Sequence, residues 1–196
     1  NLWHLFMALK HTIFKVELSI ADMDRHYYET HSLTVAQHPS ETEERMMVRI
    51  FAFARHAHER LVFAKGLSVD DEPDLWHVDY TGDILTWIDV GLPDERRIRK
   101  ACGRSNEVMV YLYGGNIADM WWKDNESKVK GLSKVSVFNL PDTSALTAMA
   151  KRNMALQYNF VFDRQGPAPQ FNNANWPQFV STLEPPAPGA LAAGTY

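Results

Sequence analysis

Apolar and polar positions alternate along two segments near the start of the chain, residues 12–20 (TIFKVELSI) and residues 26–37 (HYYETHSLTVAQ). Alternation with a period of two, together with β-branched residues, is typical of strands that bury one face. Both segments are therefore predicted to be strands.

A longer run, residues 40–65, has the helical period instead. Ser40 and Glu43 have the spacing of a capping box, and Gly66 is a typical residue at the end of a helix. Apolar side chains recur at helical spacing in this run, at Met47, Ile50, Phe51, Ala54 and Leu61. The pattern predicts a long helix with one buried face.

The second half of the chain alternates between helical and strand patterns. Helices are predicted at 93–104, 116–131 and 141–153, and strands at 107–115, 132–140 and 154–163. This alternation is typical of βα units. The predicted fold class is α/β, with a mixed central sheet flanked by helices.

One domain is expected over residues 7–183. The chain has 196 residues, of which 45% are hydrophobic and 22% are charged, as in ordinary globular proteins. Residues 1–6 (NLWHLF) lack the pattern of a signal peptide and are interpreted as an upstream extension or a cloning remnant. Residues 184–196 are rich in proline, glycine and alanine and are predicted to be a disordered tail.

Composition also narrows the location and the partners. No apolar run approaches the roughly 18 residues of a membrane helix, so no membrane partner is expected. The single cysteine, Cys102, cannot form an intramolecular disulfide, which agrees with a cytoplasmic protein. The net charge of −4 argues against a surface that is basic all over, so any phosphate-binding site must be local.

The segment EPDLWHVDYTGDILTWIDVG carries an aspartate near each end of a predicted hairpin. A turn over residues 80–83 would pair Trp76 with Trp87 and place Asp74 directly opposite Asp89. Like charges at opposed positions destabilise a sheet. The pair is therefore expected to be compensated by a divalent cation, by a nearby lysine or arginine, or by a proton on one carboxyl group.

Two alternatives stay open for this pair. Both aspartates could lie near solvent at the open end of the hairpin, where water screens their charges. A register shift of one residue would also place them on opposite faces. Glu44 is a third candidate acid. It lies on the flank of the apolar stripe of the long helix and has no helical ion-pair partner. The alternative interpretation is that Glu44 is an ordinary solvated glutamate.

Several segments resemble the YaeQ family of bacterial proteins, over nearly all of residues 7–163. They are MALKHTIFKVELSIADMDRHYY, HPSETEERMMVRIFAFA, KGLSVDDEPDLW, WIDVGLPDERRIRKACGR and VYLYGG. The resemblance implies a variant of the PD-(D/E)xK phosphodiesterase fold. In that nuclease-like core a helix flanks a mixed sheet, and the signature acids lie on adjacent antiparallel strands.

The resemblance also assigns acids to positions in the motif. Pro73 and Asp74 match its PD half, and Asp89 matches the acid of its second half. Glu44 resembles the helix glutamate that many members of the superfamily add. Gly91, however, stands where the motif has a lysine.

The resemblance suggests that the helix at 93–104 supplies the missing cation. Helical geometry favours Arg97, which lies on the flank of the buried face. Chemistry favours Lys100, because a lysine can activate a water and an arginine does not give up its proton. Lys100 is ranked first for the role, and the alternative is that the basic residues form a solvated face.

The function expected from this set is that of a phosphodiesterase or nuclease that depends on Mg²⁺ or Mn²⁺ and acts on nucleic acid. Asp74 and Asp89 would bind the metal, with the Val90 carbonyl as a further ligand, and Glu44 would bind it through water or hold a second ion. The alternative is a non-catalytic adaptor that keeps the fold and binds nucleic acid or a protein partner. Gly91 and the acidic net charge favour this alternative.

Overall fold

The computed structural model of the chain describes residues 11–65, 67, 69, 71–150 and 155–162, and the backbone of short strands at 170–171, 174–175 and 181–182. In chain order the elements are β1 (Thr12–Asp22), β2 (Tyr27–Gln37), α1 (Glu43–Arg55), β3 (Leu61–Phe63), β4 (Leu75–Val78), β5 (Ile84–Val90), α2 (Glu95–Arg104), β6 (Ser105–Tyr113), α3 (Asn116–Val129), β7 (Val135–Leu140), α4 (Ser144–Met149), β8 (Ala155–Phe162), β9 (Gln170–Phe171), β10 (Ala174–Asn175) and β11 (Ser181–Thr182). The predicted segments 1–6 and 184–196 lie outside the described residues.

The strands form two sheets, with the orders β10-β9-β8-β1-β2 and β11-β7-β6-β5-β4-β3. In the second sheet β5, β6 and β7 run parallel, while β3, β4 and β5 pair antiparallel. The predicted mixed sheet with flanking helices is confirmed. The first two strands and β8 to β10 form a separate sheet, because β8 pairs in parallel with β1. The pattern of strands along the sequence does not indicate this division.

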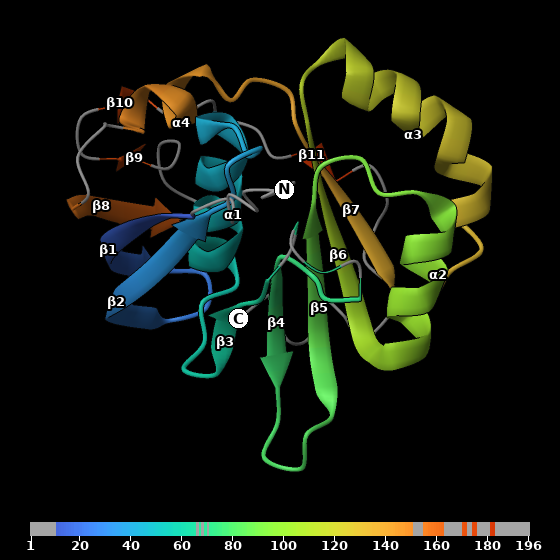
Figure 1. Ribbon diagram of the computed structural model, residues 1–196, viewed down its shortest axis with the longest axis horizontal. Helices are drawn as coiled ribbons and strands as arrows, with labels where there is room; N and C mark the ends of the chain where they lie inside the picture. The colour runs from blue at the N-terminus through green and yellow to red at the C-terminus, as the bar shows by residue number, and fades with distance from the viewer. Residues whose placement is uncertain are drawn as a thin grey trace, which may run out of the picture.

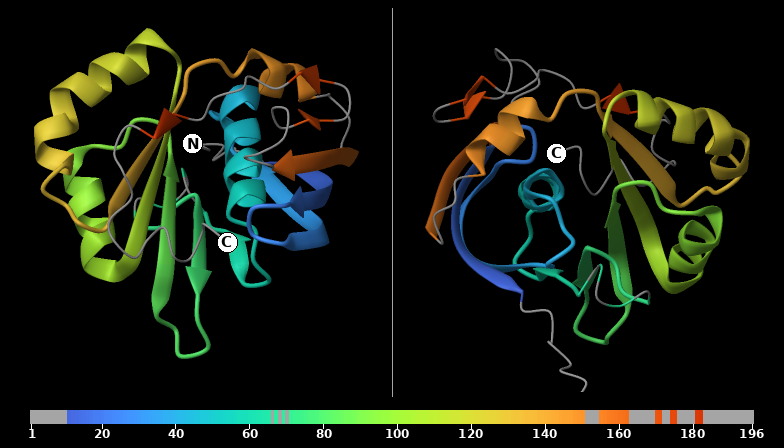
Figure 2. Two further views of the ribbon diagram at one scale, coloured as in Figure 1. Left: turned by 180° about the vertical axis from the view of Figure 1, so that it is seen from behind. Right: turned by 45° about the horizontal axis from the view of Figure 1, so that its top comes forward.

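Helix α1 lies between the two sheets, while α2 and α3 cover the other face of the six-stranded sheet (Figures 1 and 2). The side chains of residues 46–54 are all buried, so α1 contacts the core on every side. Burial on all sides explains why apolar residues extend beyond a single stripe in this helix. In the described part of the chain, no helix is both long and apolar enough to cross a membrane.

The predicted start of the long helix is wrong. Helix α1 begins at Glu43, and its N-cap is Thr42, whose hydroxyl accepts the Arg45 N–H at 3.1 Å. Ser40 lies outside the helix and hydrogen-bonds to the ring of His38 instead. Either hydroxyl could cap a helix chemically, so only the local backbone conformation decides between them.

The predicted end of this helix is also wrong. Helix α1 ends at Arg55, and residues 61–63 form β3 at the edge of the six-stranded sheet, antiparallel to β4. Leu61, Val62 and Phe63 are apolar or β-branched residues that suit a strand once a partner strand is present. Pairing across the sheet therefore overrides the local helical pattern. The other predicted helices and strands are confirmed, with ends shifted by a few residues.

The hairpin of β4 and β5 keeps the predicted register at the end that carries the aspartates. Trp76 pairs with Trp87, and the Asp74 N–H donates to the Ile88 carbonyl at 3.0 Å, so Asp74 and Asp89 face each other. The turn differs, because a β-bulge after His77 lengthens it to residues 79–83.

The longer turn has a chemical cause. The carboxylate of Asp79 accepts the N–H groups of Thr81 at 2.8 Å and Asp83 at 2.9 Å. Gly82 adopts a positive φ of 95°, which glycine reaches without strain. The aspartate thus organises a five-residue turn that the spacing alone did not indicate.

Candidate functional site

Asp74 is held by the first turn of α1. Its side chain is only 2% exposed and forms an ion pair with Arg45, whose Nη2 lies 2.8 Å from Oδ1 and 2.9 Å from Oδ2. The Val90 N–H also donates to Asp74 Oδ2 at 2.7 Å. The same Arg45 Nη2 donates to the Val90 carbonyl at 3.2 Å. A guanidinium thus binds both carboxylate oxygens and the neighbouring carbonyl.

Asp89 is held by the first turn of α2. Its side chain is 3% exposed, and Arg97 binds it through two parallel hydrogen bonds, Nε to Oδ2 at 2.9 Å and Nη2 to Oδ1 at 2.7 Å. Asp94 caps the helix by accepting the Arg97 N–H at 2.7 Å, which fixes the position from which this side chain extends. Two-point pairing of this kind is the strong geometry for arginine and a carboxylate.

Each carboxylate of the facing pair therefore has its own arginine. A nearby lysine or arginine was one of the three predicted forms of compensation, and the structure has an arginine beside each aspartate. Of the two candidates on α2, Arg97 reaches Asp89. Lys100 instead forms an ion pair with Asp71 at the surface, so its first rank for the role has no support in the geometry.

Glu44 is not part of this arrangement. Its carboxylate accepts a hydrogen bond from the hydroxyl of Thr143, the residue before α4. The structure thus brings Asp74, Asp89 and Val90 together and leaves Glu44 on another contact. A side chain on the flank of a helix has several reachable partners, and the wheel position alone does not choose among them.

The donor set for Mg²⁺ or Mn²⁺ does not fit as arranged. Within the part of the chain that the structure describes, no group of three His, Cys, Asp or Glu side chains could hold a metal ion. Both oxygens of Asp74 and both of Asp89 already accept hydrogen bonds from arginine. Mg²⁺ is bound through one or two carboxylates and keeps several waters in an octahedral shell, so an ion between these aspartates would have to displace the guanidinium groups.

Sequence reasoning missed the residues that link this pair to the core. Glu41, buried with a side chain 1% exposed, accepts from Arg45 Nη1 at 2.8 Å and from Arg49 Nε and Nη2 at 2.7 and 2.6 Å. The three residues recur every four positions, which is the spacing of helical ion pairs. This spacing could have identified the Glu41, Arg45 and Arg49 network from the sequence.

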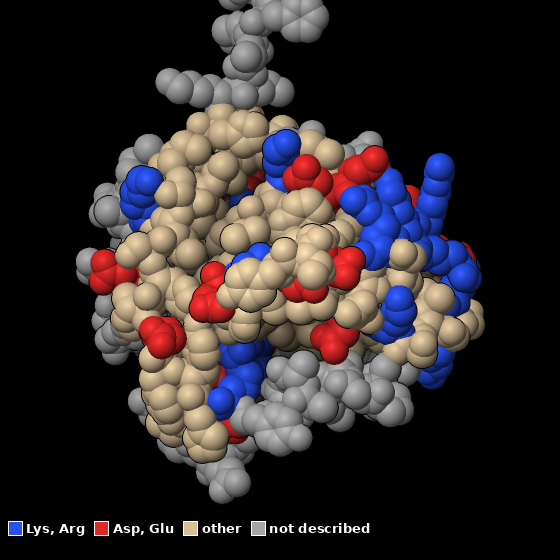
Figure 3. Space-filling model, turned by 90° about the horizontal axis from the view of Figure 1, so that it is seen from below, with Lys and Arg blue, Asp and Glu red and all other residues tan. Residues whose placement is uncertain are grey.

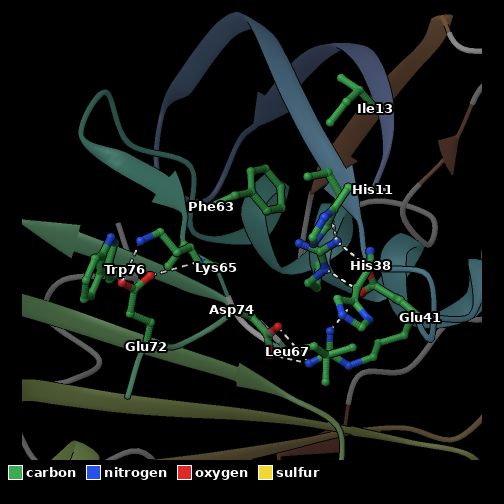
Figure 4. A pocket seen from close by; sticks show the side chains of 14 residues that line it. His11, Ile13, His38, Glu41, Phe63, Lys65, Leu67, Glu72, Asp74 and Trp76 are labelled. Carbon is green, nitrogen blue, oxygen red and sulfur yellow. Dashed lines mark hydrogen bonds and ion pairs between the residues drawn. The ribbon is translucent and has the colours of Figure 1, made fainter. Parts of the chain in front are cut away.

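A cavity of about 760 Å³ opens beside this network (Figure 4). Glu41, His11 and His38 lie together on one side of it, and Trp76 and Lys65 lie on the other. Arg45, Arg49, Asp74, Phe63, Leu67 and Ile13 are among the other residues that line it. The cavity therefore has a polar end at α1, largely apolar walls, and the Lys65–Glu72 ion pair beside Trp76.

Basic side chains gather on the other side of the acid pair, over α2 and α3, where Figure 3 shows lysine and arginine close together. Arg99 and Lys128 pair with Glu95, whereas Arg96 and Lys123 form no ion pair with the described residues. This local concentration contrasts with the net charge of −4.

The pKa of Asp89 lies above its ordinary value of 3.8. Burial raises it, the hydrogen bonds and charge of Arg97 lower it, and the charge of Asp74 raises it further. Burial outweighs the ion pair because the carboxylate has almost no contact with water. The folded state therefore binds this proton more tightly than the unfolded chain does.

The free energy of unfolding is accordingly expected to fall as pH rises from the unfolded pKa of Asp89 to its raised folded pKa, and to level off above. Asp89→Asn removes the titrating carboxyl group and should therefore remove this contribution to the decrease in the free energy of unfolding. Urea denaturation of both proteins between about pH 3.5 and about pH 7 checks it. Equal slopes in the two proteins would contradict the assignment.

Comparisons with known proteins place the chain among relatives. The family described as YaeQ protein matches residues 7–165. The "Uncharacterized protein YaeQ" of Escherichia coli (strain K12) is 47% identical over 154 residues, 77% of this chain and 84% of that protein. Its counterpart in Salmonella typhi is 46% identical over the same length, with the same coverage.

Two solved structures are similar in fold and in sequence. The YaeQ protein from Xanthomonas axonopodis pv. citri has a TM-score of 0.75 and 48% identity, covering 79% of this chain and 88% of that one. The YaeQ protein from Pseudomonas syringae has a TM-score of 0.74 and 35% identity, covering 79% of this chain and 85% of that one.

Proposed function

Because this chain belongs to the YaeQ family, we propose that it uses a nuclease-like fold of the PD-(D/E)xK type to bind nucleic acid without cleaving it. The acids of the motif stay in place, and arginines take over the role of the cation. The protein then acts as an adaptor at phosphodiester backbones.

The contacts of Arg45 carry this proposal. Its Nη2 lies within 2.9 Å of both Asp74 oxygens and 3.2 Å from the Val90 carbonyl. These same groups are the metal ligands that the resemblance to the family implies. A positive group of the protein itself thus satisfies the ligands of the expected metal.

An arginine in this position does not replace the chemistry of a metal. Hydrolysis of a phosphodiester requires a nucleophilic hydroxide near neutral pH, which a bound metal supplies by lowering the pKa of water. The guanidinium group keeps its proton in proteins and cannot act as a base. The motif position for lysine is Gly91. Neither group can therefore activate water.

Binding of nucleic acid is favoured by the basic residues on α2 and α3. Lysine and arginine near a phosphate backbone release counterions, which gives affinity without sequence specificity. The exposed Arg96 and Lys123 are available for such contacts, and Arg97 lies on the same helix as Arg96 with its side chain 26% exposed. Because these basic residues are concentrated on one surface, such binding is compatible with the acidic net charge of the whole chain.

The second candidate is a phosphodiesterase dependent on Mg²⁺ or Mn²⁺. The facing of Asp74 and Asp89 favours it, because the charge of Asp74 raises the pKa of Asp89 and a shared cation would relieve this repulsion. In that state Arg45 and Arg97 would leave the carboxylates and face the phosphate.

Fluorescence anisotropy with labelled single-stranded DNA, double-stranded DNA and RNA tests the proposed binding. Arg96→Glu should weaken the tightest of these complexes about tenfold and reduce the salt dependence of its affinity. The control is Lys15→Glu, which reverses a charge on the other sheet and should leave the affinity unchanged. Absence of binding to every probe at low salt would contradict the proposal.

A further inference from the structure

The cavity beside α1 has unused hydrogen-bond donors at its polar end. Each arginine side chain has five N–H groups. Within the described residues, neither Arg45 Nε nor Arg49 Nη1 takes part in a hydrogen bond, although the other nitrogens of both side chains do. His38 accepts the Ser40 N–H with Nδ1 at 3.1 Å, which leaves the proton of a neutral ring on Nε2.

The acceptors at the same end are already engaged. Both oxygens of Glu41 accept from Arg45 or Arg49, and both oxygens of Asp74 accept from Arg45. Among the side chains of Glu41, Arg45, Arg49 and Asp74, the remaining hydrogen-bonding groups at this end are therefore donors. A carboxylate or phosphate group has only acceptors when ionised and is complementary to them.

The rest of the cavity is mostly apolar and aromatic, with one charged pair, Lys65 and Glu72, beside Trp76. Phe63 and Trp76 form its walls, and Ile13 and Leu67 lie near its opening, 40% and 46% exposed. Its volume of about 760 Å³ is within the range of small-molecule sites, roughly 300 to 1,000 Å³. A few polar groups at one end and apolar walls elsewhere are typical of such sites.

We propose that this cavity is a binding site for a small amphiphilic anion, with a carboxylate or phosphate head at Arg45, Arg49 and His38 and an aromatic or aliphatic body against Phe63 and Trp76. The site is separate from the basic surface on α2 and α3, so it does not depend on the proposed binding of nucleic acid. Arg45 connects it to Asp74.

Isothermal titration calorimetry with 4-phenylbutyrate, phenyl phosphate and the neutral 4-phenylbutanol tests the site. At least one anion should bind at least tenfold more tightly than the alcohol. The tighter of the two anions identifies the head group as carboxylate or phosphate. Failure of both anions to bind at millimolar concentration would overturn the proposal, and so would equal binding of the alcohol.

A pair of variants tests the location. Ile13→Glu places a negative charge at the opening and should weaken binding of the anion about tenfold or more. The matched control, Ile117→Glu, makes the same change at a 63% exposed position on α3 and should alter binding less than twofold. Both sites are exposed, so both variants should fold. Equal effects of the two changes would overturn the location.

A second measurement does not depend on substitutions. In ¹H–¹⁵N spectra the indole N–H signal of Trp76, which lines the cavity, should shift on titration with the tighter anion. The Trp121 indole, which donates to the Pro93 carbonyl beside α2, should not shift. A shift of Trp121 without one of Trp76 would contradict the proposed site.

Discussion

Replacement of Asp74 with alanine is expected to lower the free energy of unfolding by about 3 to 5 kcal/mol, the usual cost of removing one partner of a buried ion pair. The variant leaves the guanidinium of Arg45 in the interior with only Glu41 as a charged partner. It also leaves the Val90 N–H without its acceptor. The arginine keeps its charge in the variant, so loss of a proton cannot relieve this cost.

Urea denaturation followed by circular dichroism measures this effect. The matched control is Asp71→Ala, which removes the same side chain from an exposed ion pair with Lys100. That variant should unfold at the urea concentration of the wild type, because water and salt screen exposed pairs. Equal destabilisation by the two changes would show that the burial of the Asp74–Arg45 pair has no energetic consequence.

The second large effect is expected at Asp22, at the end of β1. Its carboxylate is fully buried and accepts from Arg25 Nε at 2.7 Å and from Arg55 Nη1 at 3.1 Å. Arg55 lies in the last turn of α1, so this cluster joins the first sheet to the central helix. Asp22→Ala leaves two arginines without this partner and should cost about 3 to 5 kcal/mol.

The measurement is again urea denaturation, with Glu17→Ala as the control. Glu17 lies on the same strand with its side chain exposed, so its removal should not change stability measurably. A second variant, Asp22→Asn, keeps the shape and removes only the charge. If Asp22→Asn were as stable as the wild type, charge pairing would not be what holds this cluster.

Periodicity predicted most of the elements, because strands and helices with one buried face repeat at fixed spacings. The register near Trp76 and Trp87 followed from alternation and turn length. The pairing of β8 with β1 did not, since a strand pattern does not specify its partner. The same limit applies to β3. Its residues continue the helical pattern of the sequence, and only pairing with β4 makes them a strand.

The candidate site was predictable in its backbone and less so in its side chains. Strand register brought Asp74 opposite Asp89 without knowledge of the fold. The choice between Arg97 and Lys100 required the direction of each side chain from α2, and the ranking by chemistry chose the residue that pairs with Asp71. Long side chains reach many partners, so local spacing does not select one.

Glu41 and its arginines were overlooked for a related reason. The capping box assigned to Ser40 placed the N-cap two residues too early, so Glu41 fell at the first position of the predicted helix and not before its N-cap. In the structure Glu41 precedes the N-cap Thr42 and its carboxylate turns back to Arg45 and Arg49. The boundary was therefore wrong by two residues at the point where this buried network begins.

Titration of the wild-type protein with Mn²⁺, followed by electron paramagnetic resonance, tests the central claim most directly. If Arg45 and Arg97 occupy the carboxylate oxygens of the two aspartates, no Mn²⁺ ion should bind at this pair. The spectrum at millimolar Mn²⁺ should then contain no bound-ion signal that disappears in Asp89→Asn. The opposite result is one ion bound at submillimolar Mn²⁺ that is lost in both Asp74→Asn and Asp89→Asn. That result would contradict the assignment of the pair to arginine and favour a metal-dependent hydrolase.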